Sequence, residues 1–326
     1  MDLKNTLINA SKDIHKILID PSPDERESVG KKVKFLNFGS MNIDTFFRVD
    51  HIVRPGETIS ADSIEKRAGG KGLNQSIALA KVSDELYHAG NIGADGKFLL
   101  DEMKANKVDI SLVRTSKKQT GNAIIQVDHK GENSIILFKG ANFDNSKEYI
   151  DQVLGKFGEN DILLLQNEIN LLPYIVDRAY DRGMKIALNP SPITEQLKNI
   201  DLNKTDLLLV NEIEAKTLAN VDKEEDVIKF FRENYPDLKI VMTLGAKGSV
   251  YIDREKIIRQ DSYKVKVIDS TGAGDTFTGY FLGYFYKGHS LEESLEIASK
   301  AAALSVSKKG ASISIPSHKE VLSFKG

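Results

Sequence analysis

The residues best suited to chemistry form the run Asp269-Ser-Thr-Gly-Ala-Gly-Asp275. Gly272, Ala273 and Gly274 carry little or no side chain, so the backbone can approach a ligand closely and its N–H groups can point at an anion. Asp275 follows at once and begins an apolar helical pattern, and a helix N-terminus adds roughly half a positive charge. A phosphoryl transfer needs a cradle for migrating negative charge and a base for the attacking hydroxyl. This loop therefore predicts phosphoryl transfer.

An amphipathic helix must hold this loop in place. Aromatic residues after Asp275 recur at i, i+3, i+4, i+7 and i+8, which is the spacing of one helical face. These residues are Phe277, Tyr280, Phe281, Tyr284 and Phe285. We expect that face to lie in the core and the loop to lie at the start of the helix.

Alternating strand and helix patterns after Val33 predict the scaffold behind the loop. Compact apolar strands are expected at 34–38, 161–166, 185–189, 206–211 and 239–245. Strands this continuously apolar are buried on both faces, as in a parallel sheet covered by helices. Helices are expected at about 72–81 and from a capping box at 290–293 to about Lys308, with Gly310 as the stop. The pattern is typical of an α/β fold.

Two segments depart from this rhythm. Residues 46–66 and 120–138 alternate apolar and polar positions between polar turns, which predicts a small sheet outside the main one. Residues 1–32 are interpreted as an N-terminal extension of short amphipathic helices and a polar linker. An extra surface helix is favoured there over a regulatory or DNA-binding addition.

Polar residues close each of the buried strands. Parallel sheets bind ligands outside the carboxyl ends of their strands, so these positions predict a site along one sheet edge beside Asp275. For any one of them alone, a helix cap or a turn residue is the favoured interpretation, and the functional interpretation rests on their number beside the Gly272–Asp275 loop. The residues are Gln166, Glu168, Asn189, Asn211, Glu212, Glu214, Thr243 and Gly245.

A second glycine cluster precedes the helix expected at 72–81. Its run Gly69-Gly-Lys-Gly-Leu-Asn74 brings the donors of Lys71 and Asn74 to a place where backbone can approach a polyol, although a flexible turn would look the same. The spacing is not that of a P-loop, and Phe277 replaces the third glycine of a dinucleotide fingerprint at the other loop. Asn42 and Asp44 add a donor and an acceptor suited to sugar hydroxyls.

The amino-acid composition and net charge limit which kinds of cofactor and binding partner the protein can have. The 326 residues contain no cysteine, which excludes disulfides, thiolate catalysis and cysteine–metal sites. A formal net charge of −2 with interspersed signs does not favour nucleic acid or a membrane surface as a partner. The six histidines lack metal-ligand spacing, and no apolar run approaches the ~20 residues of a membrane span. We expect a cytoplasmic protein.

Together these motifs resemble the ribokinase family of carbohydrate kinases, also called the PfkB family. The resemblance covers about 34–316, and its most specific part is Asp269 to Phe277. Supporting matches lie at 39–44, 55–58, 69–74, 188–192, 211–214 and 308–311. It implies a kinase domain at 33–326, built as a three-layer α/β/α sandwich with a mostly parallel sheet. It also implies a small β-sheet lid formed by about 44–68 and 120–139.

The resemblance also implies a role for each matching residue. Asp275 resembles the catalytic base, and Gly272, Ala273 and Gly274 resemble the anion hole. The implied sugar contacts are Asn42, Asp44, Gly70, Lys71, Asn74, Glu168 and Asp275. The implied nucleotide contacts are Asn211, Glu214, Thr243, Gly245 and Gly274, with Glu214 also organising Mg²⁺ through water. The implied site for a monovalent cation, typically K⁺, comprises Asp269, Thr271, Ser305, Lys308, Gly310 and Ser314, several through backbone carbonyls.

Within the family, the Gly69–Asn74 run and Pro55-Gly-Glu-Thr58 resemble members that use ATP to phosphorylate the 5-hydroxyl of D-ribose, giving ribose 5-phosphate and ADP. Leu73 and Lys300 depart from that pattern, at the sugar and adenine sides respectively. The alternatives are a kinase of another furanose, a ketose or a nucleoside, and a non-catalytic sugar-binding regulator. The resemblance further implies a homodimer formed through the lid.

Overall fold

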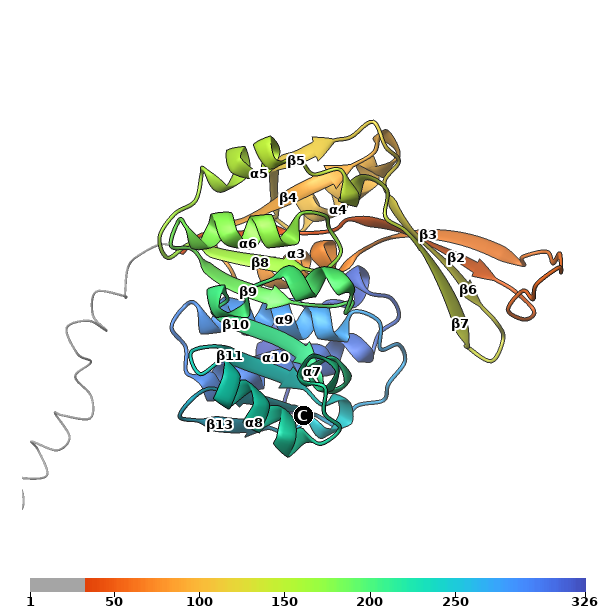
Figure 1. The fold of residues 1–326 in the computed structure, drawn as a ribbon. Coiled ribbons are helices and arrows are strands. Elements are labelled where there is room, and N and C mark those ends of the chain that lie inside the picture. Colours follow the sequence, from red (N-terminus) through yellow and green to blue (C-terminus); the bar gives the residue numbers. More distant parts are fainter. Residues whose placement is uncertain (1–32) are drawn as a thin grey trace, which may run out of the picture. The chain divides into compact units, whose positions relative to one another are not determined.

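The computed structural model describes residues 33–326, and the extension interpreted at 1–32 lies outside the described residues. A nine-stranded sheet in the order β13-β12-β11-β10-β9-β8-β1-β4-β5 forms its middle layer (Figure 1). The strands from β5 to β11 in this order are parallel, and β12 pairs antiparallel with both β11 and β13. Their bounds are β1 Phe35–Phe38, β4 Leu86–Ile92, β5 Asp109–Thr115, β8 Ile162–Gln166, β9 Lys185–Asn189, β10 Leu207–Asn211, β11 Lys239–Thr243, β12 Ser249–Ile252 and β13 Ile257–Gln260.

Two separate cores cover the two faces of this sheet. Alternate residues of each strand point to opposite faces, so Leu36 and Phe38 enter one core while Phe35 enters the other. This double burial explains why the central strands are apolar without alternation. The predicted α/β fold with a mostly parallel sheet is therefore confirmed.

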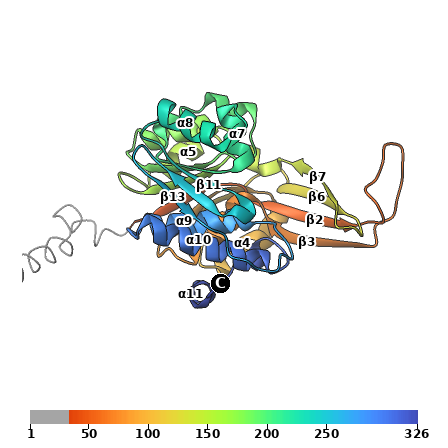
Figure 2. The same ribbon diagram turned by 90° about the horizontal axis from the view of Figure 1, so that it is seen from below.

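Helices form the two outer layers (Figure 2). The first core is closed by α5 Lys147–Leu154, α6 Leu172–Tyr180, α7 Glu212–Ala219 and α8 Glu224–Asn234. The second is closed by α3 Lys71–Ala80, α4 Lys97–Ala105, α9 Ala273–Phe285 and α10 Leu291–Val306, with α11 His318–Ser323 beside them. Short 3₁₀ turns lie at Ala94–Gly96, Gly140–Phe143, Glu195–Asn199, Leu202–Lys204, Gly245–Lys247 and Ser312–Ser314.

A separate four-stranded sheet projects from the edge of these layers (Figure 1). We call it the small sheet, and its strands are β2 Asn42–Arg48, β3 Ser63–Gly69, β6 Gly121–Val127 and β7 Asn133–Phe138. Its order is β3-β2-β6-β7, with β2 and β6 parallel and the other pairs antiparallel. The second sheet predicted from the alternating segments is thus confirmed.

Some helix boundaries differ from those expected. The helix expected to begin at Asp275 begins at Ala273, because Gly272 takes a left-handed conformation with φ 75° and becomes the N-cap. The box expected at 290–293 is half formed. The Ser290 hydroxyl accepts from the Glu293 amide at 3.1 Å, while the Glu293 carboxylate pairs with His289 at 3.0 Å.

Glycines bring α9 and α3 into close contact. A Cβ on Gly279 would lie 2.5 Å from Ala78 Cβ, and one on Gly283 would collide with Val82. Because neither side chain exists, the two backbones approach closely, and their N-termini lie together at the carboxyl edge of the sheet. Across residues 33–326, no helix has both the length and the apolar character needed to cross a membrane.

Candidate active site

The polar strand ends predicted to form one site do lie along one edge of the sheet. Gln166 pairs in register with Asn189, and Asn211 pairs with Thr243, at the carboxyl ends of β8 to β11. The start of α9 meets this edge, and α3 begins beside it. The parallel topology therefore gathers residues from distant parts of the sequence.

Asp275 is the best-held carboxylate at this edge. Its side chain is only 6% exposed, and each oxygen accepts one amide hydrogen bond. Asn74 Nδ2 donates at 3.0 Å, and Gln75 Nε2 donates at 2.9 Å. Two neutral donors from α3 thus fix the carboxylate in direction while leaving its other lone pairs available to a hydroxyl. Asn74 Oδ1 is buried without a partner among the described residues, so this side chain can also accept a bond from a ligand.

Gln75 is a site residue that we did not predict. Its amide nitrogen also lies 3.2 Å from Asn189 Oδ1, and its oxygen accepts from Gln166 Nε2 at 2.7 Å. It therefore ties Asp275 to the ends of β8 and β9. Its place directly after Asn74 was the available signal, but sequence spacing alone does not show that two successive helix residues both reach the same carboxylate.

The loop before Asp275 has the form of an anion cradle. Gly272 needs its positive φ to turn the chain into α9, and Gly274 is exposed with no atom close to where a Cβ would stand. The first amides of a helix have no intrahelical acceptor, so those of Gly274 and Asp275 can bind an anion, while the Ala273 amide donates to the Ser270 carbonyl at 3.3 Å.

The predicted sugar contacts gather on the other side of Asp275. Glu168 accepts from the Ser40 hydroxyl and, at 3.1 Å, from the Lys71 amide. Gly70 has φ 92° and lies against the backbone of Asn42. Gly69 has the same kind of role, since a Cβ there would overlap the Asp44 carboxylate. The two glycines therefore let the start of α3 approach β2.

Carboxylates crowd this space and perturb one another. Burial, together with the charges of Glu168 and Asp275, raises the pKa of Asp44 to about 7 against the opposing effect of Arg67. Burial also raises the pKa of Glu168. For Lys71, burial acts to lower the pKa, but the carboxylates of Asp275, Glu168 and Glu214 outweigh it and raise the pKa. Lys71 is thus the cation that holds this acidic group together.

Four of the five predicted nucleotide contacts lie at the ends of β10 and β11, and the fifth, Gly274, lies in the first turn of α9. Asn211 and Glu214 form a capping box at the start of α7, with bonds of 2.8 and 3.0 Å. Thr243 is the register partner of Asn211, and Gly245 follows with φ 59° and open space around it. The structure thus brings all four residues to the ends of two neighbouring strands.

The predicted cation-site residues are drawn together by Asp269. One of its oxygens accepts from the Thr271 amide and hydroxyl at 2.9 and 2.7 Å, and the other accepts from the Gly310 amide at 2.9 Å. Burial opposes these bonds, which nevertheless lower the pKa of Asp269. Ala311 in turn lies against Gly272. This joins the segment at 308–311 to the anion cradle.

The remaining predicted members use their side chains elsewhere. Ser305 and Ser314 donate their hydroxyls to the carbonyls of Ala302 and Ala311, and the Lys308 amine pairs with Glu320. Lys308 could therefore contribute only its main-chain carbonyl, while the two serine hydroxyls, which donate here, keep oxygen lone pairs that a cation could share. Within the described residues, no three His, Cys, Asp or Glu side chains gather as metal ligands.

A cavity of about 140 Å³ lies beside the sugar contacts. It shares Asn42 and Glu168 with them, but it is not lined by Asp275, so it lies beyond the reacting end of the site. Its other walls come from β7 and from loops after β7, β8 and β9. They include Leu137, Phe138, Lys139, Asn142, Phe143, Asn167, Pro192, Thr194 and Gln196, none of which we predicted as site residues.

A buried carboxylate at a helix N-terminus, open backbone before it and a nearby cavity bordered by polar side chains fit a sugar phosphotransferase on a three-layer α/β/α scaffold. Comparison with known proteins agrees. The model of the pfkB family carbohydrate kinases matches residues 34–318. The chain belongs to this family and is a carbohydrate kinase.

Named relatives support the assignment. The chain is 35% identical over 299 residues to a ribokinase of Haemophilus influenzae, covering 88% of this chain and 96% of that protein. Its structure matches a ribokinase of Cryptococcus neoformans in complex with ADP, with a TM-score of 0.79, 32% identity and coverage of 89% and 99%. It matches an Arabidopsis thaliana ribokinase complexed with ribose and ATP equally well, with a TM-score of 0.79, 31% identity and coverage of 89% and 97%.

Proposed function

We propose that this chain transfers the terminal phosphoryl group of ATP to the 5-hydroxyl of D-ribose, producing ribose 5-phosphate and ADP. The observation that carries the proposal is the Asp275 carboxylate, held by two amides beside the open backbone of Gly272–Gly274. The ribokinases that it resembles include one complexed with ribose and ATP.

In this proposal, Asp275 accepts the proton of the attacking hydroxyl as the P–O bond forms. Base assistance of this kind is worth ~10²–10⁴ in rate. The amides at the start of α9 stabilise the charge on the transferred group, and loss of one such donor costs on the order of 3–4 kcal/mol. The loop therefore contributes more as a unit than Asp275 does alone.

The nucleotide would lie along the ends of β10 and β11. We assign Asn211, Glu214, Thr243 and Gly245 to it, and Glu214 fits Mg²⁺ held through water because its capping bond uses only one of its oxygens. Mg²⁺ neutralises phosphate charge when bound. The protein's own part is to hold these groups in line with the cradle.

We also assign a monovalent-cation site to the segments joined by Asp269. These segments fit K⁺ because Asp269 keeps a negative charge there, while the other atoms that could coordinate the cation are neutral oxygens. A bound cation adds fixed positive charge next to Gly272.

Asn42, Asp44, Gly70, Lys71, Asn74 and Glu168 would bind the sugar hydroxyls, with the small sheet acting as a lid. Another furanose, a ketose or a nucleoside is the alternative substrate. The test is ADP release with ATP and a panel of these sugars and nucleosides. The highest kcat/KM is expected for D-ribose. A clear preference for a nucleoside would refute the proposed substrate, and no turnover with any polyol would refute the kinase assignment.

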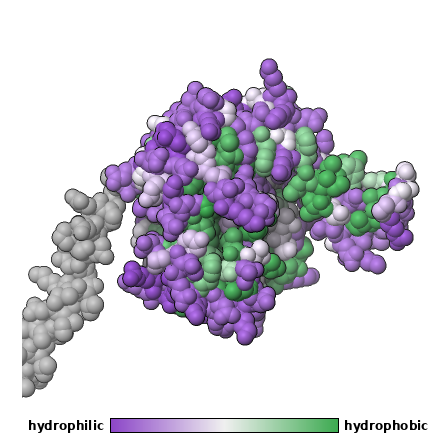
Figure 3. Space-filling model, in the orientation of Figure 1, coloured by the Kyte–Doolittle hydropathy of each residue, from purple (hydrophilic) through white to green (hydrophobic). Residues whose placement is uncertain are grey.

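We further propose that two copies associate through the small sheet. Apolar side chains gather on it (Figure 3). Ile64, Ile124 and Ile136 are 62%, 37% and 59% exposed, and strand register places them on the face opposite to Asp44. An apolar patch of this kind is typical of a protein–protein contact.

A further inference from the structure

We propose that Asn142 is a positioning residue that fixes the direction of the Asn42 amide, so that Asn42 presents its NH₂ group to the sugar. The inference rests on the proposed function, which assigns Asn42 to the substrate. Both side chains line the cavity beside the sugar contacts, and both are buried, at 3% and 8% exposure.

The hydrogen bonds determine which end of each amide faces which neighbour. The backbone amide of Met41 donates to Asn142 Oδ1 at 3.0 Å. Because a backbone N–H can only donate, the Asn142 oxygen must lie on that side. Asn142 Nδ2 then donates to Asn42 Oδ1 at 2.7 Å. The oxygen of Asn42 is therefore occupied, and its Nδ2 has no hydrogen bond with any described residue. That NH₂ group is the end left for a ligand.

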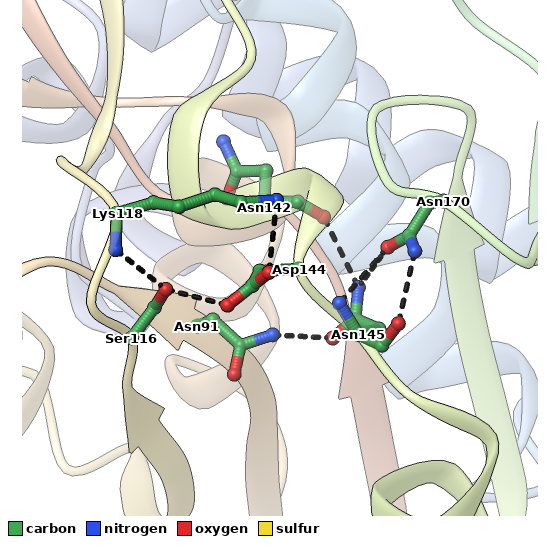
Figure 4. A network of polar contacts seen from close by, with 7 residues as sticks. All are labelled: Asn91, Ser116, Lys118, Asn142, Asp144, Asn145 and Asn170. Atoms are coloured by element: carbon green, nitrogen blue, oxygen red, sulfur yellow. Dashed lines mark hydrogen bonds and ion pairs between the residues drawn. The ribbon is translucent and has the colours of Figure 1, made fainter.

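A network of polar side chains holds Asn142 in turn (Figure 4). Asn145 Nδ2 donates to the backbone carbonyl of Asn142 at 3.0 Å and to Asn170 Oδ1 at 2.9 Å, and Asn91 donates to Asn145 Oδ1 at 2.6 Å. Asp144, directly before Asn145, accepts from Ser116 at 2.6 Å and pairs with the exposed Lys118 at 2.8 Å. This network anchors the turn that follows β7, so Asn142 meets Asn42 at a fixed place.

Replacing Asn142 by Asp keeps the size of the side chain but reverses the direction of its hydrogen bond with Asn42. The carboxylate of Asn142→Asp can still accept from the Met41 amide, but it cannot donate to Asn42. Asn42 must then turn its amide to donate to the new carboxylate, which points its oxygen at the sugar. An oxygen acceptor in place of a donor loses one substrate hydrogen bond, which corresponds to about 3- to 10-fold in binding. Asn42 lines a cavity that Asp275 does not line, so kcat should change less than KM.

The test is a double-mutant cycle on the full-length enzyme. KM and kcat are measured for the sugar that the wild type phosphorylates best, in Asn42→Ala, Asn142→Asp and the double variant. We expect each single change to raise KM about 3- to 10-fold, and the double change to raise it no further than Asn42→Ala does. Asn160→Asp is the matched control, since it makes the same change at an exposed position outside this network, and it should leave KM within about twofold.

Multiplicative effects of the two changes on KM would overturn the inference, as would an unchanged KM in Asn142→Asp. Should Asn142→Asp not fold, Asn142→Ala replaces it in the same cycle, with the same expectation. If the wild type phosphorylates no sugar, the proposed function is refuted, and with it the role of Asn142 that depends on that function. If it is active and the cycle shows independence, only the positioning role of Asn142 fails.

Discussion

At the scale of single residues, the site concentrates more acid than its nearby cations can neutralise. Asp44, Glu168 and Asp275 surround a space whose principal cation is Lys71. A polyol suits such a space because each hydroxyl can donate to a carboxylate and accept from Lys71 or an asparagine. The crowding also makes the folded protein sensitive to pH.

Asp44 provides a stability prediction. Its ordinary pKa is 3.8, and in the folded protein the value is about 7. Between these values the folded state binds more protons than the unfolded state, so stability falls as pH rises through that window. The Asp44→Asn variant has no titrating group at this position. Its free energy of unfolding should therefore rise relative to that of the wild type by up to about 4 kcal/mol between pH 4 and 7.5. Urea unfolding of both proteins across this range measures the difference, and a difference independent of pH would contradict the prediction.

Asp275 provides a kinetic prediction. Asp275→Asn removes the proton acceptor but keeps the size of the side chain, so we expect kcat to fall by at least about 100-fold with the fold intact. Coupled ADP release and thermal unfolding measure the two effects. Asp101→Asn, which makes the same change on the exposed surface of α4, should have wild-type turnover. Near-normal turnover of the Asp275 variant would show that another group accepts the proton.

At the scale of elements, the sequence predicts the central strands best, since a short apolar run between turn signals is typical of a strand buried on both faces. The strands expected at 185–189 and 161–166 agree with β9 and β8 to within a residue. We did not predict β4 and β5 at one end of the sheet, nor β12 and β13 at the other, because most of these strands mix apolar and polar residues. The start of α9 was placed two residues late, because the pattern of aromatic residues does not register the left-handed turn at Gly272.

Site residues divide in the same way. Site residues in a glycine-rich motif could be predicted, because close approach of the backbone to a neighbour requires glycine, which is visible in the sequence. Gln75 and Asn142 could not, since a polar residue that holds another side chain looks the same in sequence as one that faces solvent. Their roles depend on which strands and turns become neighbours, as at the pairing of β8 with β9.

The segment joined to the start of α9 provides a prediction at this scale. With Mg²⁺ saturating, turnover should be several-fold faster in K⁺ than in Na⁺ at equal ionic strength, because a fitting cation adds positive charge beside the cradle. Asp269→Ala should remove the difference, since it releases the bonds to Thr271 and Gly310. Equal rates of the wild type in both salts would remove the cation site from the proposal.

At the scale of the molecule, the small sheet carries both the sugar contacts proposed on β2 and the apolar face assigned to a second copy. We expect the protein to be a dimer in light scattering after gel filtration. Ile136→Glu should convert it to monomers, while Ile135→Glu, on the other face of β7, should have the smaller effect. A larger effect of Ile135→Glu than of Ile136→Glu would place the dimer contact on the face that carries Asp44. A monomeric wild type would refute the proposed dimer.

The contact of Gly279 and Gly283 with α3 bears on how the enzyme moves. Helices whose backbones touch cannot slide without collision, so we expect the Asp275 carboxylate on α9 and the two amides on α3 to move together. In the proposed function, closure on a substrate then falls to the small sheet and its connections. Larger residues at these two glycines would push the helices apart and misalign the proton acceptor, with no alteration of any group that touches the sugar.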